Sequence, residues 1–442
     1  MSALRNTLAA LALLMGGATA HAEGADQADR ITRGQYQAVL GDCMACHTRP
    51  GGAPFAGGAP LETPFGRLVP PNITQDPETG IGNWNEADFT RMMRTGIGHG
   101  GRRLYPAMPY PAYSMMTDQD IADLWAYMAT VQPVRNAVVA NQLPFPFNIR
   151  LAMWGWNLLN FRPEPFRADP AQSAEWNRGA YLVQGPGHCG SCHTPKNIMG
   201  ADDTGQALRG ASLQGWFAPD ITGNSQTGIG GWSQEELVTY LRTGVNTHSV
   251  ASGPMREAVE NSTSRMSDAD LRAIAVYLRS LNGTAPPAPQ PLAATEPRMQ
   301  AGGAIYAANC AACHGGEGRG ARQLFPALAG NPLLRQANPE TLVHLVLAGS
   351  QGAQTPGAPT TPAMPSLGWR LNDQQVADVL TYVRNSWGNA APPVAPHEVA
   401  KQRDGEPEKP WALVIGGVVL VCLLVLATAL LMRRRRRRHA VA

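Results

Sequence analysis

The chain has 442 residues, 44% of them hydrophobic, so it is too long for one ordinary domain and apolar enough to bury several cores. Its net charge of +3 comes from its ends, because Arg433 to Arg438 and Arg5 all lie there. Without these seven arginines the chain has 29 basic and 33 acidic residues, a net charge of −4. This balance argues against nucleic-acid binding, which needs a basic face on the folded part.

The N-terminus has the pattern of a secretory signal. Leu8 to Met15 forms a short apolar stretch after Arg5, and Ala20-His21-Ala22 fits an A-x-A cleavage site. We therefore predict that residues 1–22 are a signal peptide and that the mature chain lies outside the cytoplasm.

The body of the chain repeats one helical pattern three times. The first helix of each repeat is predicted over residues 29–40, 175–184 and 298–309. A middle helix is predicted over residues 85–95, 233–243 and 338–348. A closing helix follows Thr117, Ser267 and Asn372, which are suitable N-cap residues. The sequence therefore predicts three all-α modules, at 28–135, 174–283 and 298–388, and these ranges define modules one, two and three below.

The segments between the modules differ in composition. Residues 284–297 and 389–410 are rich in proline, which predicts extended spacers. Residues 136–173 are aromatic-rich instead, with Phe145, Phe147, Trp154, Trp156 and Phe161 among few charges. This segment is open to two interpretations: packing between modules or against a partner, and contact with a membrane surface or a quinone.

Residues 411–432 are 22 consecutive uncharged residues. As a helix they would extend about 33 Å, enough to cross the hydrocarbon core of a bilayer. The arginines that follow favour a cytoplasmic tail at 433–442, with the modules on the periplasmic side of a bacterial inner membrane. The other interpretation of the arginines is a nucleic-acid or nuclear-targeting tail. Cys422, inside the apolar stretch, is interpreted as a small apolar residue rather than a lipidation site.

Each module contains the pentapeptide C-x-x-C-H, at residues 43–47, 189–193 and 310–314. Two thiols at this spacing reach two vinyl groups on one edge of a porphyrin, and the next residue places an imidazole under the iron. One such motif could be chance or part of a zinc site, but three copies in a chain with seven cysteines predict three covalently bound haem c groups. The covalent attachment residues would be Cys43, Cys46, Cys189, Cys192, Cys310 and Cys313, and the proximal iron ligands would be His47, His193 and His314.

A haem that only transfers electrons needs a sixth ligand, which is commonly a methionine thioether. Met108, Met255 and Met364 lie in the loops before the closing helices, 61, 62 and 50 residues after the proximal histidines. We predict these three as axial ligands, with Met266 as the alternative in module two. The other histidines considered, which are not predicted as ligands, are His99, His188, His248 and His344.

Together these features resemble the cytochrome c subunit of bacterial membrane-bound alcohol, aldehyde, gluconate, sorbitol and fructose dehydrogenases. The resemblance rests on the leader, the three C-x-x-C-H motifs, the T-G-I-G-x-W loops at residues 79–84 and 227–232, Tyr105-Pro-Ala-Met108-Pro and the C-terminal apolar stretch. It implies an all-α fold of three tandem class I cytochrome c-like domains, here with a C-terminal transmembrane helix. It also implies a partner, a periplasmic catalytic subunit of quinoprotein, flavoprotein or molybdenum type, and electron delivery to ubiquinone.

Other functions stay open at this stage. The chain could be a stand-alone multihaem redox enzyme such as a peroxidase, which needs one iron with a vacant sixth position. It could also donate electrons to a terminal oxidase, or be a passive haem-bearing assembly protein. We find no nucleophile–base arrangement and no cofactor loop that would oxidise a substrate, so we predict no catalytic residues in this chain.

Overall fold

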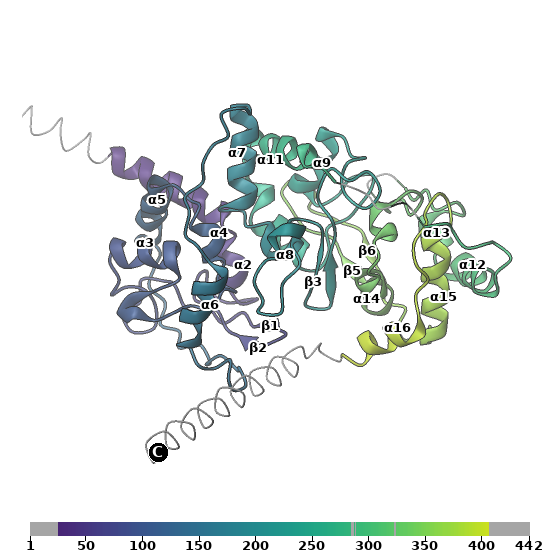
Figure 1. Cartoon of the computed structure of the whole chain (residues 1–442), viewed down its shortest axis with the longest axis horizontal. Helices are drawn as coiled ribbons and strands as arrows, with labels where there is room; N and C mark the ends of the chain where they lie inside the picture. Colours follow the sequence, from purple (N-terminus) through teal and green to yellow (C-terminus); the bar gives the residue numbers. More distant parts are fainter. Residues whose placement is uncertain (1–24, 284–286, 288, 322–323, 406–442) are drawn as a thin grey trace, which may run out of the picture.

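A computed structural model describes residues 25–283, 287, 289–321 and 324–405 (Figure 1). Its helices form three groups in chain order, with the second group between the first and the third (Figure 1). Each group surrounds its own apolar core, represented by Phe89 and Leu124, by Leu182 and Ile274, and by Val343 and Leu380. The fold of the described residues is therefore mainly helical, as expected.

The first module begins with a helix over residues 25–40. It continues with α2 (Cys43–His47), β1 (Leu61–Thr63), β2 (Gly66–Leu68), α3 (Glu86–Thr95), η1 (His99–Gly101), α4 (Tyr110–Tyr113) and α5 (Asp118–Met128). A helix that was not expected, α6 (Ala152–Asn160), lies in the segment after it.

The second module follows the same plan of first helix, motif helix, hairpin, middle helix and closing helix, with different short helices between them. Its elements are α7 (Ala174–Gln184), α8 (Gly190–His193), η2 (Thr204–Gln206), β3 (Ala211–Leu213), β4 (Trp216–Ala218), α9 (Gln234–Thr243), α10 (Pro254–Asn261), η3 (Thr263–Arg265) and α11 (Asp268–Ser280). The third module contains α12 (Pro297–Asn309), α13 (Ala311–His314), η4 (Pro332–Arg335), α14 (Glu340–Ala348), β5 (Ser350–Gln351), β6 (Ala363–Met364) and α15 (Asp373–Arg384), and α16 (Pro396–Arg403) follows.

The closing helices α5, α11 and α15 begin as the sequence predicts. The side chains of Thr117, Ser267 and Asn372 each accept a hydrogen bond from the backbone N–H three residues later. Such caps satisfy one of the backbone donors that have no partner inside the helix. The three predicted N-caps are confirmed.

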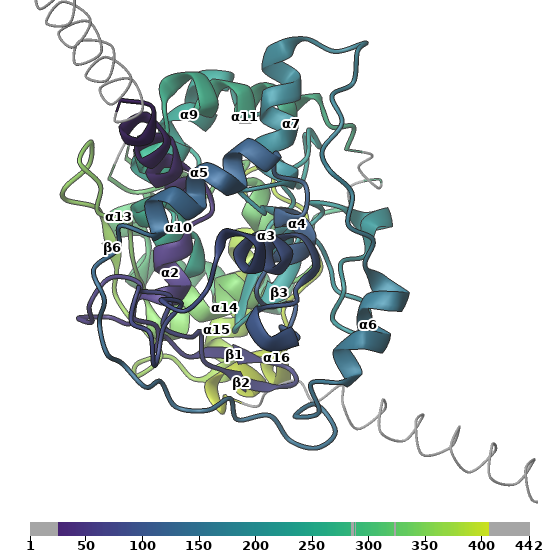
Figure 2. The same cartoon turned by 90° about the vertical axis from the view of Figure 1, so that its left-hand side faces the viewer.

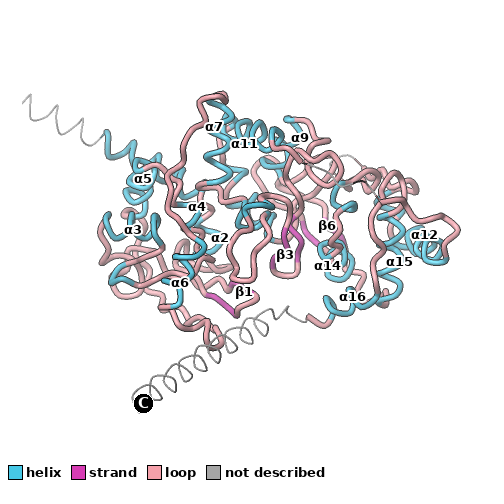
Figure 3. Tube along the Cα trace, viewed as in Figure 1, coloured by secondary structure: helices cyan, strands magenta, loops and turns pink. Residues whose placement is uncertain are grey.

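The described residues contain three antiparallel hairpins, visible as the short strands in Figure 3, which were not predicted. In the second, Ala211 pairs with Ala218 across a turn in which Gln214 and Gly215 both have positive φ. Two successive residues of positive φ make the tight turn whose twist matches that of paired strands. Strands of two or three residues are too short to produce a readable alternation in the sequence.

The first helix of each module crosses its closing helix at a glycine. A Cβ at Gly34 would lie 1.8 Å from the carbonyl oxygen of Asp123. The corresponding distances are 2.0 Å from Gly179 to Ala273 and 2.2 Å from Gly302 to Asp378. The two backbones can approach this closely only where the side chain is a hydrogen.

Modules two and three are joined by the β3–β4 hairpin, which lies against α14. Thr341 bonds the backbone of Phe217 twice: its Oγ1 accepts from the N–H at 2.8 Å and donates to the carbonyl at 2.9 Å. The rings of Trp216 and His344 pack 4.1 Å apart beside these bonds. His344, expected on a helix, therefore takes part in a contact between modules.

The segment at 136–173 packs on one side and is exposed on the other. On α6, Trp156 is buried against Tyr110 and donates its indole N–H to the carbonyl of Met199 at 2.9 Å. Trp154 and Leu158 on the same helix are more than half exposed. Figure 2 shows α6 at the edge of the molecule.

Two expectations at the C-terminal end need correction. The predicted spacer at 389–410 is not simply extended, because α16 covers residues 396–403 and Val399 is fully buried in the third core. The fold prediction also included a transmembrane helix, and no helix among the described residues is long and apolar enough to cross a membrane. The predicted span at 411–432, the tail at 433–442 and the signal peptide at 1–22 lie outside the described residues.

We predict that Gly179→Ala destabilises the protein by about 1–3 kcal/mol or more, because the new methyl group would overlap the backbone of α11. Urea unfolding followed by circular dichroism measures this effect. The matched control is Gly155→Ala on α6, where a Cβ meets nothing within 4 Å. Since alanine favours helix, the control should be neutral or slightly stabilising. Equal stability of the two variants would contradict the close crossing.

Candidate cofactor sites

The three C-x-x-C-H motifs form short helices directly after the first helix of each module. The motif helices are α2, α8 and α13. Residues at positions i, i+3 and i+4 of a helical turn lie on one side, so both thiols and the imidazole of a motif share a face. All six motif cysteines are unpaired.

The motif histidines make the same hydrogen bond in every module. Nδ1 lies 2.8 Å from the carbonyl oxygen of Pro71 in His47 and 2.7 Å from that of Pro219 in His193. In His314 the distance to the oxygen of Pro326 is 3.2 Å. A carbonyl oxygen can only accept, so Nδ1 carries the proton and Nε2 keeps a lone pair for a metal.

Burial lowers the pKa of all three imidazoles, and the hydrogen bonds to the proline carbonyls offset this lowering only in part. The same effect raises the pKa of Cys43 and Cys189 to about 12, so the free thiols are protonated near neutral pH. The motifs thus present neutral side chains to their surroundings.

The structure brings each predicted methionine to the apolar cluster that holds a motif cysteine. Met108 packs in the cluster with Cys43, Met255 in that with Cys189, and Met364 in that with Cys310. These methionines occupy different local structures: a loop before α4, the first turn of α10, and strand β6. The alternative residue, Met266, is buried directly before α11 in the same cluster as Met255 and Cys189, so this cluster holds both candidates of module two.

A partly open cavity of about 4120 Å³ is lined mostly by modules one and two and reaches residues of module three such as His344. Both motifs line it, and so do Met108 and Met255. A pocket for one small molecule is commonly about 300–1,000 Å³, so this cavity has room for more than one large planar cofactor.

The sequence analysis did not identify a set of three side chains, a tryptophan, a histidine and an acidic residue, that occurs in modules one and two. Trp232 stacks on His248, with ring centroids 5.3 Å apart, and His248 bonds Glu236 at 3.0 Å. In module one Trp84, His99 and Asp88 form the equivalent set, with a ring separation of 6.1 Å and a bond of 2.7 Å. The tryptophans end the repeated T-G-I-G-x-W loops, and this repeat was the available signal.

The indole nitrogen of Trp232 is buried, has no hydrogen-bond partner and belongs to a residue that lines the cavity. A buried donor without a partner is costly, so it calls for an acceptor that the protein chain itself does not supply. A carboxylate on a bound cofactor meets this need. The site therefore fits an acidic planar group such as haem.

His188, which was not predicted as a ligand, lies between modules one and two. Its Nε2 is 3.3 Å from the carbonyl oxygen of Gly41, and its ring meets Tyr113 edge to face at 5.5 Å. Tyr113 in turn donates to the same carbonyl at 2.7 Å. The backbone just before the first motif is thus held by both modules.

Comparison with known proteins agrees with the division of the chain into three modules. The family model for cytochrome c matches residues 31–132, 177–282 and 299–387. The gluconate 2-dehydrogenase cytochrome c subunit of Pantoea cypripedii is 40% identical over 421 residues, which cover 90% of this chain and 95% of the relative.

Two further relatives have the same kind of description. The cytochrome c subunit of the quinone alcohol dehydrogenase of Gluconobacter oxydans (strain 621H) is 40% identical, over 84% of this chain and 81% of the relative. The fructose dehydrogenase cytochrome subunit of Gluconobacter japonicus is 38% identical, over 88% of this chain and 86% of the relative.

Proposed function

The chain belongs to the family of dehydrogenase cytochrome c subunits, and on this premise we propose that it carries three haem c groups and relays electrons from a catalytic subunit to ubiquinone. Family membership implies covalently bound haem c and a role as the electron-transfer subunit of an oxidoreductase. The number of haems, their ligands, the donor and the acceptor are parts of the proposal.

The observation that carries the proposal is the bond from the motif histidine to a proline carbonyl, found in all three modules. It supports His47, His193 and His314 as proximal ligands. The shared clusters support Met108 and Met364 as the second axial ligands, and in module two they support Met255 with Met266 as the alternative. Thioether attachment would then use Cys43, Cys46, Cys189, Cys192, Cys310 and Cys313.

Bound haem would supply a reversible one-electron couple at each site. The chain's own groups set its environment. Each proline carbonyl holds its imidazole in one tautomer and makes it a stronger electron donor. A methionine opposite the histidine raises the reduction potential. Apolar walls limit water, and the indole N–H of Trp232 offers an acidic group a hydrogen bond.

The relay needs a partner, because we assign no substrate-oxidising site to this chain. We propose a periplasmic catalytic subunit of quinoprotein, flavoprotein or molybdenum type, acting on an alcohol, an aldehyde, gluconate or a similar substrate. The names of the relatives support this, since each describes a cytochrome subunit of a dehydrogenase.

We also propose that the exposed side of α6 contacts the periplasmic surface of the inner membrane. Leu151, Trp154 and Leu158 are 75%, 57% and 68% exposed, at the helical spacing that puts them on one side. Residues 136–163 contain Arg150 and Arg162 and no acidic residue. Apolar side chains with tryptophan and flanking arginines suit the boundary of an anionic bilayer.

The ligand assignment predicts that Met364→Ala removes one methionine–iron absorption signature and leaves the other two. An intact mass with three haem additions would show that attachment is unaffected, since the thioethers do not involve methionine. The control is Met199→Ala, because Met199 is 40% exposed and lies outside all three motif clusters. Three unchanged signatures in Met364→Ala would exclude it as a ligand.

The relay predicts that deleting this chain while keeping the catalytic subunit abolishes substrate-dependent ubiquinone reduction in membranes. Oxidation with an artificial dye should persist, because a dye takes electrons directly from the catalytic subunit. Quinone reduction at the wild-type rate would contradict the relay.

If α6 contacts the membrane as proposed, Leu158→Glu should release the protein from vesicles that contain anionic lipid, since a charge replaces an exposed apolar side chain. Cosedimentation should fall about tenfold, while the haem spectra stay unchanged. Leu324→Glu is the matched control, because Leu324 is 58% exposed and belongs to module three. Equal cosedimentation of the two variants would exclude membrane contact through α6. If Leu158→Glu instead weakens binding of the catalytic subunit and leaves lipid binding unchanged, the exposed side of α6 would be assigned to that partner.

A further inference from the structure

Modules one and two contact each other through a pair of equivalent tyrosines. The first helix of each contains the sequence R-G-x-Y, which ends at Tyr36 and at Tyr181. The glycine in each copy is the crossing residue, Gly34 or Gly179. The two tyrosines therefore occupy the same place in their modules.

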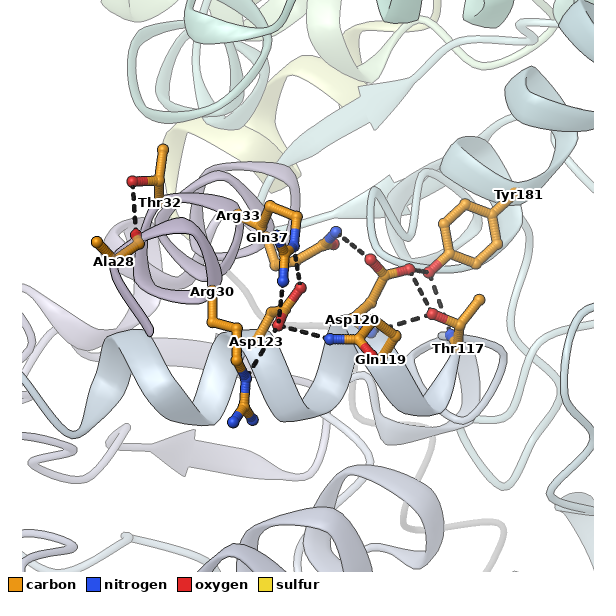
Figure 4. A network of polar contacts seen from close by, with 10 residues as sticks. All are labelled: Ala28, Arg30, Thr32, Arg33, Gln37, Thr117, Gln119, Asp120, Asp123 and Tyr181. Atoms are coloured by element: carbon orange, nitrogen blue, oxygen red, sulfur yellow. Dashed lines mark hydrogen bonds and ion pairs between the residues drawn. The ribbon is translucent and has the colours of Figure 1, made fainter. Parts of the chain in front are cut away.

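Each tyrosine hydroxyl binds the start of the closing helix in the other module. Tyr36 donates to a carboxylate oxygen of Asp270 at 2.7 Å and accepts from the backbone N–H of Ser267 at 3.0 Å. Tyr181 donates to Asp120 and accepts from the backbone N–H of Thr117 at 3.3 Å (Figure 4). We call these two sets of bonds the tyrosine locks.

The locks are reciprocal. Ser267 and Thr117 are the N-caps of α11 and α5, and Asp270 and Asp120 stand three residues later in each. The tyrosine of module one binds the N-cap residue and the aspartate of module two, and the tyrosine of module two binds the N-cap residue and the aspartate of module one. This is the pattern of a two-fold symmetric interface, here between two modules of one chain.

Neighbouring groups hold the carboxylates in place. Arg178 donates to both oxygens of Asp270, at 2.8 and 2.9 Å. Gln37 donates to Asp120 at 2.5 Å, and Thr117 donates to it at 2.8 Å. Tyr181 and Asp270 are buried, whereas Tyr36 and Asp120 are half-buried, so water is excluded from one member of each pair.

The third module lacks both halves of a lock. Two residues after its crossing glycine, Gly302, stands Ala304 instead of tyrosine. Three residues after its N-cap, Asn372, stands Gln375 instead of aspartate. The third module forms the same helices without these groups, so folding of a single module does not require them.

Tyr181 belongs to the apolar cluster that holds Cys189 and Met255, and Tyr36 packs against it. The helix that starts at Pro254 and carries Met255 packs against motif helix α2 of module one. His188, next to the second motif, reaches Gly41 just before the first. Both sites open into the same cavity. A rotation between the modules would therefore change the separation of these sites directly.

We infer that Tyr36 and Tyr181 are positioning residues that fix the first two haem sites at one separation, so that modules one and two act as a single rigid electron-transfer unit. The inference rests on the proposed haem content. Electron exchange within this unit moves one electron from a ferrous to a ferric haem and changes no bond, so its rate depends on the distance that the locks maintain.

The test uses the full haem-loaded protein and the double variant Tyr36→Phe/Tyr181→Phe. Phenylalanine keeps the rings and removes both hydroxyls. Tyr277→Phe is the matched control, because the Tyr277 hydroxyl accepts a bond from Gln184 within module two at 2.6 Å. All three proteins are first checked for three haem additions and for methionine–iron absorption.

Two measurements follow. Amide hydrogen exchange at Thr117 and Ser267 should become at least about tenfold faster in the double variant and not in the control, which corresponds to about 1.4 kcal/mol of lost protection. Electron redistribution between the first two haems after rapid partial reduction should slow several-fold, with the reduction potentials and methionine–iron absorption unchanged.

The outcomes separate the two proposals. Fewer than three haems in the wild type would overturn the proposed function, whereas the exchange measurement would still test the locks. Equal exchange and equal redistribution in the double variant and in Tyr277→Phe would overturn the inference. Slower redistribution together with lost methionine–iron absorption would also overturn it, because the tyrosines would then act on a module's own fold.

Discussion

Every module depends on one close crossing, between the helix that precedes the C-x-x-C-H motif and the closing helix. The crossing leaves no space for a side chain at Gly34, Gly179 or Gly302, so the partner carbonyl lies almost against the backbone. The motif follows the first helix directly, and the candidate methionine lies in the segment between the middle helix and the closing helix. The contact between these two backbones therefore positions the motif and the methionine segment relative to each other.

The remainder of the site is built from local parts that each module supplies itself. A proline carbonyl holds the imidazole, and an apolar cluster gathers the methionine and a cysteine. In modules one and two a stacked tryptophan and histidine complete the wall, with an acidic residue behind the histidine. Such independence explains how one pattern can be repeated three times in a chain and still yield sites with different surroundings.

The contacts between modules are of two different kinds. Modules one and two meet symmetrically, through equivalent tyrosines that bind equivalent helix starts. Modules two and three meet through unlike surfaces, the β3–β4 hairpin of one and helix α14 of the other. The chain is therefore a symmetric pair of modules with a third module attached, and its exposed apolar helix α6 belongs to the connection within the pair.

The sequence alone determined the repeat, the first, middle and closing helix of each module and the N-caps of the closing helices, because these depend on residue types at short spacings. Family membership, inferred from the sequence motifs, is confirmed by the relatives. The predicted transmembrane helix is the exception, since no described helix can span a membrane. Tertiary structure decided what lies between distant segments: the glycine crossings, the partner of each motif histidine, the folding of residues 396–403 onto the third core, and the tyrosine locks. The physical reason is that each of these joins residues far apart in the chain, and an identical R-G-x-Y sequence does not reveal that its hydroxyl binds the other module rather than its own.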